Sequence, residues 1–262
     1  MNANDFEPSG TPTSTSRIVT PEKRTDALRE VNRGSRPLAV LWEWTKIFWI
    51  SVALFLVIRT FFVEAFHIPT GSMENTILPG DFLLVNKLAY GAEVPFTHDR
   101  LPALEHPKFG DVIVFDWPVD PTKNFVKRLV GLPGDTLEMR DGILVRNGHR
   151  VHESYVYRED PEADQSVDDF EWQRRYLEPS VSHQSYAPSR DTWGPLVVPP
   201  KHYFVLGDNR DDSLDSRYWG FVPDSLVTGR PILIYYSYAP DSNQALAWVT
   251  HVRWKRLGEL VR

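Results

Sequence analysis

The chain has 262 residues, of which 42% are apolar and 24% charged, a composition that can bury a sizeable core. Its formal net charge of −6 argues against an extended nucleic-acid surface, which normally carries a basic balance. Because the sequence has no cysteine, a thiol nucleophile, a disulfide framework and thiolate metal sites are excluded. We therefore expect a globular protein that binds no nucleic acid.

Residues 1–37 are rich in Ser, Thr, Pro and charge and lack apolar periodicity, which predicts a flexible cytoplasmic tail. An apolar run then extends from Ile47 to Val63 and is interrupted by Arg59. At ~1.5 Å per residue this run spans about 25 Å, slightly less than a hydrocarbon core of ~30 Å. Residues 38–44 therefore have to contribute, or Arg59 has to reach the interface. We predict a transmembrane anchor over residues 38–63.

A buried core helix or a removed signal peptide would also produce such a run. Against both, Trp42, Trp44 and Trp49 suit a membrane interface, and no small-residue cleavage pattern follows Val63. Lys and Arg precede the run but are absent from the dozen residues after it, which by the positive-inside tendency predicts a cytoplasmic N-terminus. The basic residues before Ile47 are Arg17, Lys23, Arg24, Arg29, Arg33, Arg36 and Lys46. We expect a single span of the cytoplasmic membrane, with residues 64–262 on its outer, periplasmic side.

Residues 64–262 are predicted to be mainly β, because six short runs rich in Val, Ile, Leu, Phe and Tyr are bounded by Gly, Pro and Asp. These runs occupy residues 82–91, 111–119, 124–132, 142–151, 201–208 and 230–239. We expect antiparallel sheets with an irregular insertion subdomain at about 138–200. Within it, residues 153–200 are polar, dotted with proline and without clear strands. GLPGD, residues 131–135, is predicted to be a turn between strands.

We first exclude the catalytic motifs that the sequence does not contain. Ser72 lies in Gly71-Ser72-Met73, which does not match the G-x-S-x-G nucleophile elbow. The eight histidines are scattered and form no H-E-x-x-H motif, so we expect neither a metal nor a cofactor. Asp and Arg are interleaved in residues 207–220, a composition that by itself favours a charged turn.

Ser72 stands nine residues beyond Val63, so even an extended link of ~3.5 Å per residue keeps its Oγ within about 30 Å of the membrane edge. Pro69-Thr70-Gly71 predicts a tight bend in which Gly71 lets another backbone approach closely. Taken alone, this stretch is also typical of a plain turn serine.

A serine nucleophile needs a neighbouring base, and an unprotonated lysine is a candidate. Strand alternation puts Phe125, Lys127 and Leu129 on one face of their run. An apolar setting is what lowers a lysine pKa, which has to fall by about 2 to 3 from ~10.4 to serve at neutral pH. Arg128 cannot serve, because arginine stays protonated. The pattern leaves open which face of the strand looks inward.

Three segments, in this order, resemble the signature boxes of type I signal peptidases, also called leader peptidases. They are IPTGSM at residues 68–73, KRLVGLPGD at 127–135 and GDNRDDS at 207–213, the last continuing as LDSRYWGFVP. The resemblance covers most of residues 66–238 apart from 153–200. It implies a membrane-bound serine-lysine endopeptidase that removes signal peptides from exported preproteins through an acyl-enzyme.

The resemblance also implies a role for particular residues. Ser72 would be the nucleophile and Lys127 the general base. The Ser72 backbone N–H and the Thr70 hydroxyl would hold the oxyanion, and Ser213 would orient the lysine ammonium. The supporting charge network would consist of Asp208, Asp215 and Arg217. Shallow pockets for small substrate residues at positions −1 and −3 would be walled by Phe66, Ile68, Phe125 and Val126.

The sequence departs from the commonest family pattern in three places. Thr70 stands where serine is frequent, Asn75 stands where proline is frequent, and one span precedes the first box where some relatives have two. Thr70 keeps a hydroxyl, so only the strength of that donor is affected. The other two departures concern the loop path and the anchor.

Two other functions are also considered. One is a self-cleaving, repressor-type serine-lysine peptidase, against which the apolar run and the absence of a DNA-binding segment count. The other is a membrane-anchored β-domain that binds exported chains without cutting them. Aromatic and basic residues near the C-terminus predict either a surface that contacts the lipid bilayer or a half-buried strand pair. They are Tyr235, Tyr236, Tyr238, Trp248, Arg253, Trp254, Lys255 and Arg256.

Overall fold

The computed structural model describes residues 37–94, 97, 99–160, 164, 168–240 and 246–262. The predicted tail lies outside the described residues except for Pro37. The chain divides into two compact units after Leu54.

The long helix α2 (Pro37–Val57) continues as the π-helical segment η1 (Ile58–Phe62). Residues Val40–Phe62 are long and apolar enough to cross a membrane, and the most apolar part of this stretch is not buried in the protein. At ~1.5 Å per residue these 23 residues span about 35 Å, because the helix includes residues ahead of the run at Ile47. The apolar segment is therefore longer than the run alone indicated.

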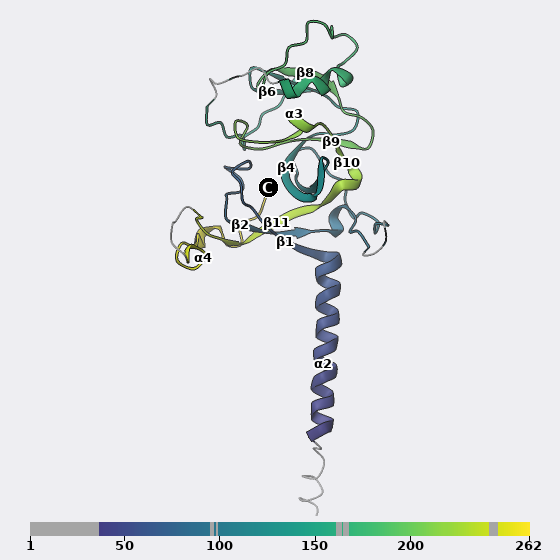
Figure 1. Ribbon diagram of the computed structural model, residues 1–262, viewed down its shortest axis with the longest axis vertical. Helices are drawn as coiled ribbons and strands as arrows, with labels where there is room; N and C mark the ends of the chain where they lie inside the picture. Colours follow the sequence, from purple (N-terminus) through teal and green to yellow (C-terminus); the bar gives the residue numbers. More distant parts are fainter. Residues whose placement is uncertain (1–36, 95–96, 98, 161–163, 165–167, 241–245) are drawn as a thin grey trace, which may run out of the picture. The chain divides into compact units, whose positions relative to one another are not determined.

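The larger of two sheets has seven antiparallel strands in the order β1-β2-β11-β3-β4-β9-β10. The strands are β1 (Val63–His67), β2 (Asp81–Asn86), β3 (Val112–Trp117), β4 (Asp120–Gly131), β9 (His202–Leu206), β10 (Val222–Pro223) and β11 (Val227–Ser237). Figure 1 shows β2 and β11 side by side in this sheet. The prediction of a mainly antiparallel β protein with one long apolar helix is confirmed. Two of the expected runs differ in detail. The run at 82–91 ends in the 3₁₀ helix η2 (Leu88–Tyr90), and the run at 142–151 forms two strands joined by a turn.

The smaller sheet has the order β7-β6-β5-β8. Its strands are β5 (Thr136–Arg140), β6 (Ile143–Arg146), β7 (His149–Arg150) and β8 (Trp193–Val197). Asp141-Gly142 and Asn147-Gly148 join successive strands, and all four residues have positive φ, as the two-residue hairpin turns that match strand twist require. The predicted turn at 131–135 is confirmed, because it links β4 to β5.

The expectation that residues 153–200 lack clear strands is wrong. Strand β8 lies there and pairs with β5, and a 3₁₀ helix, η3, covers Asp168–Tyr176. Phe170, Trp193 and Leu196 are fully or almost fully buried. These few apolar residues are widely spaced in a polar sequence, so the segment acquires a core only by packing against β4, β5, β6 and β9.

Three apolar clusters form the core, and β4 contributes to each of them. Val126 packs into one cluster, Leu129 into the second and Val130 into the third. Both faces of β4 are therefore covered, which answers the question of which face looks inward. Lys127 and Arg128, on opposite faces, are both buried.

The remaining short helices lie in the second half of the described chain. They are α3 (Ser216–Trp219), η4 (Asp224–Leu226), α4 (Ala247–Thr250) and η5 (Trp254–Arg256). The alternative of a half-buried strand pair holds only for its first half. Tyr235 and Tyr236 lie on β11, and Tyr238 forms an isolated antiparallel bridge with Val252. The C-terminal segment itself contains α4 and η5, which leave Trp248 and Trp254 exposed.

Candidate active site

Ser72 lies in the turn between β1 and β2. Backbone N–H groups of Glu74 and Ile77 donate to the carbonyls of Gly71 and Met73, and the buried side chains of Met73 and Ile77 anchor the turn in the core. This packing fixes Ser72 at a buried position. The expected close approach of another backbone at Gly71 is wrong, because a Cβ there would meet the side chain of Glu74.

Asn75, where relatives often carry proline, has a φ of 82°. Proline is locked near −65°, so this turn cannot accept it. The Asn75 side chain also donates to the carbonyl of Tyr155 at 3.1 Å. The departure at Asn75 thus has a structural reason in the path of this turn.

Lys127 lies in direct contact with Ser72. Its Nζ donates to Ser72 Oγ at 2.5 Å and lies 5.5 Å from the centre of the Phe125 ring. Only 4% of Lys127 is exposed. Burial lowers the pKa of Lys127 to about 8, even though the carboxylates of Asp215 and Asp208 favour the charged form. The site therefore combines a serine hydroxyl with a lysine that loses its proton near neutral pH.

A cavity of about 350 Å³ opens onto this pair. Its lining residues are Phe66, His67, Ile68, Pro69, Thr70, Ser72, Met73, Asn124, Phe125, Val126, Lys127, Asp212 and Leu214. It thus includes all four residues expected to wall the substrate pockets, and the walls around the serine are mostly apolar. His67 stacks against Phe82 and Tyr238 and makes no hydrogen bond with Ser72.

Two hydrogen-bond donors expected at an oxyanion site lie at this cavity. Among the described residues, no hydrogen bond occupies either the Ser72 N–H or the exposed Thr70 hydroxyl. Both donors are therefore open to a bound group.

Gly207 provides the close approach to Ser72. A Cβ on Gly207 would lie 2.4 Å from the Ser72 carbonyl oxygen and 2.2 Å from Ser213 Oγ. The Asn209 N–H also donates to the Ser72 carbonyl at 3.2 Å. Sequence reasoning missed Gly207 as a site residue, although its place at the head of the third family box was the available signal. The buried Ser213 hydroxyl packs here and makes no hydrogen bond with Lys127.

Two buried ion pairs lie behind the dyad. Arg128 donates to both carboxylate oxygens of Asp208, at 2.7 and 2.6 Å, and Arg217 donates to both oxygens of Asp215, at 2.8 and 2.9 Å. Burial alone would raise the pKa of Asp215, but Arg217 and the Gly207 N–H hold it below its ordinary value. Such pairing is what makes burial of these charges tolerable.

The composition of residues 207–220 favoured a charged surface turn, and that reading is wrong. Asp208, Asp215 and Arg217 are completely buried, and the partner of Asp208 comes from β4. In the described part of the chain, no group of three or more His, Cys, Asp or Glu side chains could hold a metal ion.

Comparison with known proteins finds one family and several similar chains. A family described as "Signal peptidase, peptidase S26" matches residues 41–236. Signal peptidase I of Pseudomonas aeruginosa is 38% identical over 229 residues, which cover 82% of this chain and 77% of that protein. The enzyme of Pseudomonas fluorescens is 37% identical over 224 residues, covering 81% and 78%. A crystal structure of a signal peptidase I from Enterococcus faecalis V583 shares 34% identity with 49% of this chain and 98% of that chain, with a TM-score of 0.33.

The chain has a long apolar helix followed by a β-domain, and a serine of this domain lines a mostly apolar cavity. These are the features of a membrane-anchored serine peptidase. The chain belongs to the type I signal peptidases of peptidase family S26. Its activity is that of signal peptidase I, the cleavage of signal peptides from preproteins. A repressor-type peptidase and a binding domain without activity are thereby set aside.

Proposed function

We propose that Ser72 is the nucleophile and Lys127 the general base of this peptidase, acting through an acyl-enzyme. The observation that carries the proposal is the 2.5 Å hydrogen bond between Lys127 Nζ and Ser72 Oγ. Protonated Lys127 donates this bond, and the neutral amine can instead accept the Ser72 proton. A pKa near 8 leaves enough neutral amine for this reaction around neutral pH.

The reaction then proceeds in two stages. Neutral Lys127 takes the hydroxyl proton as Ser72 Oγ attacks the carbonyl carbon of the scissile bond. The lysine ammonium returns this proton to the leaving amine, which releases the mature protein and leaves an ester on Ser72. Lys127 next takes a proton from a water molecule that attacks the ester. The lysine ammonium gives this proton to the departing Ser72 Oγ, which restores the serine hydroxyl and the neutral amine, and the signal peptide leaves as a carboxylic acid that ionises in water.

The Ser72 N–H and the Thr70 hydroxyl are proposed to hold the oxyanion, because both face the cavity without a hydrogen-bond partner. Asp208, Asp215 and Arg217 are proposed to support the dyad electrostatically. Ser213 is proposed to orient the ammonium once substrate closes the site, because its hydroxyl lies beside Gly207 and the Ser72 carbonyl.

The cavity is proposed to select small residues at positions −1 and −3 of the signal peptide. Phe66, Ile68, Phe125 and Val126 line it and leave shallow apolar space beside the serine. We expect substitution of the −1 residue by Phe or Trp to block processing, because overpacking such a space costs ~1–3 kcal/mol or more. The measurement compares cleavage of preproteins that differ only at position −1, with the shortened product detected on a denaturing gel. Unimpaired cleavage of the Phe substrate would refute the pocket assignment.

The enzyme is membrane-anchored, and its finer location and organisation are proposed from charge. We assign residues 1–37 to a cytoplasmic tail, 38–63 to one span of the cytoplasmic membrane and 64–262 to an outer, periplasmic catalytic domain. The basic residues before Ile47 and their absence just after Val63 support this orientation.

A substitution at Ser72 tests the dyad. Ser72→Ala removes the nucleophile, so we expect cleavage of a preprotein to fall by ~10³-fold or more, whereas stability changes by only ~1 kcal/mol. Ser237→Ala is the control, because Ser237 is also buried, its hydroxyl donates to Asp81 at 2.6 Å, and it does not line the cavity. If more than a few per cent of wild-type activity survives in Ser72→Ala, Ser72 is not the nucleophile.

A further inference from the structure

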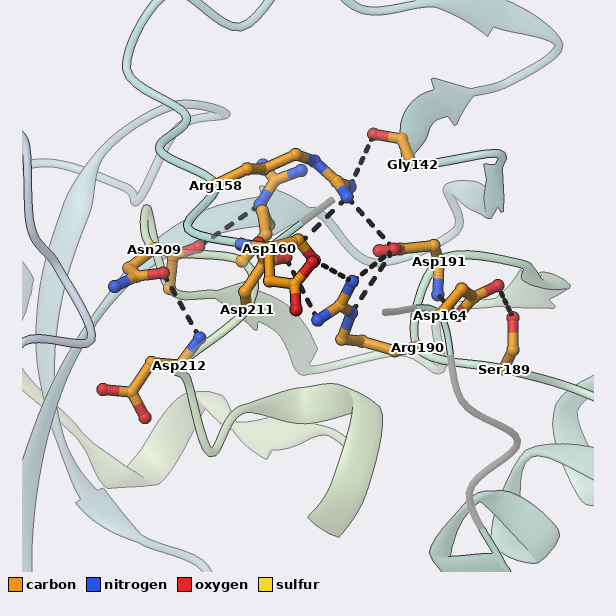
Figure 2. A network of polar contacts seen from close by, with 12 residues as sticks. Gly142, Arg158, Asp160, Asp164, Ser189, Arg190, Asp191, Asn209, Asp211 and Asp212 are labelled. Atoms are coloured by element: carbon orange, nitrogen blue, oxygen red, sulfur yellow. Dashed lines mark hydrogen bonds and ion pairs between the residues drawn. The ribbon is translucent and has the colours of Figure 1, made fainter. Parts of the chain in front are cut away.

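A largely buried network of two arginines and two aspartates joins the insertion to the third family box, with Arg158 the most exposed member at 20% of its side chain. Arg158 and Arg190 both reach Asp191, at 3.1 and 2.8 Å, and both reach Asp211, at 3.8 and 3.4 Å. Figure 2 shows the two guanidinium groups pointing at the same pair of carboxylates, while the carboxylate of Asp212 points away. Asp211 thus faces the insertion, and its neighbour Asp212 lines the catalytic cavity.

The backbone around Arg158 runs along the box. The Tyr157 N–H donates to the Asp208 carbonyl at 2.8 Å, and the Arg210 N–H donates to the Tyr157 carbonyl at 3.0 Å. The Asp160 N–H then donates to the Asp211 carboxylate at 2.8 Å. Residues 157–160 therefore hold one edge of residues 208–211.

The opposite edge of the same short segment touches the nucleophile. The Asn209 N–H donates to the Ser72 carbonyl, and Gly207 packs directly against that carbonyl. The box is consequently held between Ser72 on one side and the insertion on the other. Arg158 and Arg190 tie the insertion side together through Asp211, whose side chain is 5% exposed.

We infer that Arg158 and Arg190 are positioning residues: through Asp211 they hold residues 207–215 against Ser72, so that Lys127 stays shielded from water. This inference rests on the proposed roles of Ser72 and Lys127. It gives the polar insertion a part in the reaction, although neither arginine lines the cavity.

Loosening the network should change the protonation of Lys127. The charged and titratable groups that face Lys127 or its cavity are Asp208, Asp212, Asp215, Arg217 and His67. Because burial is the main cause of the low pKa of Lys127, water entering behind a displaced box raises that pKa toward its ordinary value. The acid limb of the pH–activity profile, where activity rises as Lys127 loses its proton, then moves to higher pH.

Two substitutions that change the charge of the network in opposite directions distinguish a positioning role from a direct electrostatic effect on the pKa of Lys127. Arg158→Met removes a positive charge and Asp211→Ala a negative one, yet both break the network. A field effect alone moves the acid limb in opposite directions, upward for Arg158→Met and downward for Asp211→Ala. Positioning moves it upward in both.

The experiment measures kcat and KM for cleavage of a preprotein by the full-length enzyme between about pH 6 and 10. We expect Arg158→Met and Asp211→Ala each to lower kcat by ~10-fold or more at neutral pH, to leave KM within ~3-fold, and to shift the acid limb upward by ~0.5 or more. Arg158→Lys keeps a cation and should recover part of kcat. The control is Arg146→Met, which removes a partly buried ion pair with Asp135 away from the box.

Each outcome decides the inference. Opposite shifts of the acid limb, or kcat losses matched by Arg146→Met at the same loss of thermal stability, would overturn it. If a variant does not fold, Asp211→Asn and Arg190→Gln, which remove one charge each and keep a polar side chain, supply the same comparison. Ser72→Ala is run alongside, because surviving activity there contradicts the proposed dyad itself, whereas an inactive Ser72→Ala with unaffected network variants contradicts only the positioning role.

Discussion

Lys127 and Arg128 are adjacent on β4, are both almost completely buried, and tolerate burial in different ways. Arg128 cannot lose its proton, so it is held by both oxygens of Asp208 and stacks 3.9 Å from the centre of the Tyr155 ring. Lys127 has no such bidentate partner, and burial lowers its pKa to about 8. Arg128 thus keeps its charge, whereas Lys127 can lose its proton, as a general base has to.

Replacing Lys127 by Met tests this difference. Between its folded pKa of about 8 and the unfolded value near 10.5, the unfolded chain binds more protons, so wild-type stability rises with pH across that window. Below it, burial of the ammonium is a cost that Met does not carry. We expect Lys127→Met to raise the free energy of unfolding at pH 7 by about 1 to 3 kcal/mol and the difference to shrink toward pH 10.5.

Denaturation of both proteins at several pH values, with cleavage assays, measures this effect. Activity of Lys127→Met should fall by ~10³-fold or more. Wild-type activity should climb as pH rises through about 8. A Lys127→Met protein that unfolds more easily than wild type at pH 7, or that still cleaves, would show that Lys127 is a structural charge.

Among the elements, the turn that carries Ser72 depends on a segment more than 130 residues away. Gly207 has no side chain in the space beside Ser72 and Ser213, and its φ lies outside the left-handed region. A methyl group there would collide with the Ser72 carbonyl. Packing alone, and not backbone conformation, therefore demands glycine at this position.

Gly207→Ala should therefore inactivate the enzyme by displacing Ser72. We expect a loss of ~10²-fold or more in kcat together with a destabilisation of ~1–3 kcal/mol. Gly134→Ala is the control, because Gly134 has a φ of 87° and open space around it, so alanine there is strained without touching the site. Kinetics and thermal melts of both variants make the comparison. Equal activity losses in the two variants would mean that instability, not displacement of Ser72, inactivates the enzyme.

Across the whole molecule, the catalytic unit exposes large apolar side chains along its C-terminal segment. Trp254 is 74% and Trp248 57% exposed, and Tyr235 on β11 is also exposed. Basic Lys255 lies in the same η5 segment as Trp254, whereas the Arg256 side chain is paired with Asp81 and Glu259. Tryptophan and basic residues together are typical of surfaces at a membrane interface.

A chain lacking residues 1–63 should therefore bind vesicles that contain anionic lipid. Replacing Trp248 and Trp254 by Ser should weaken binding by ~10-fold or more, because each buries a large ring at the interface. Flotation with vesicles measures the bound fraction, and Trp44→Ser in the full-length chain controls for the anchor. Absence of any affinity in the truncated chain would favour an ordinary solvent-exposed surface.

The apolar helix and the β class could be predicted from local signals in the sequence, and the candidate dyad from the resemblance of three short boxes to a known family. Apolar length, period-2 alternation and the order of three short boxes are all visible without contacts. The resemblance also indicated Asp208, Asp215 and Arg217 as a charge network, but it did not indicate Arg128, the buried partner of Asp208. The sequence did not predict β8 or the core of the insertion, since Phe170, Trp193 and Leu196 are too widely spaced to form a pattern.

The environment of the site residues could be seen in the tertiary structure alone. The fold covered both faces of β4, so that Lys127 and Arg128 are buried side by side, and it placed Gly207 against Ser72. The physical reason is that burial, a lowered lysine pKa and a steric need for glycine all arise from atoms brought together from distant segments. No local pattern carries that information, because the neighbours that create each effect are separated in sequence by tens of residues or more.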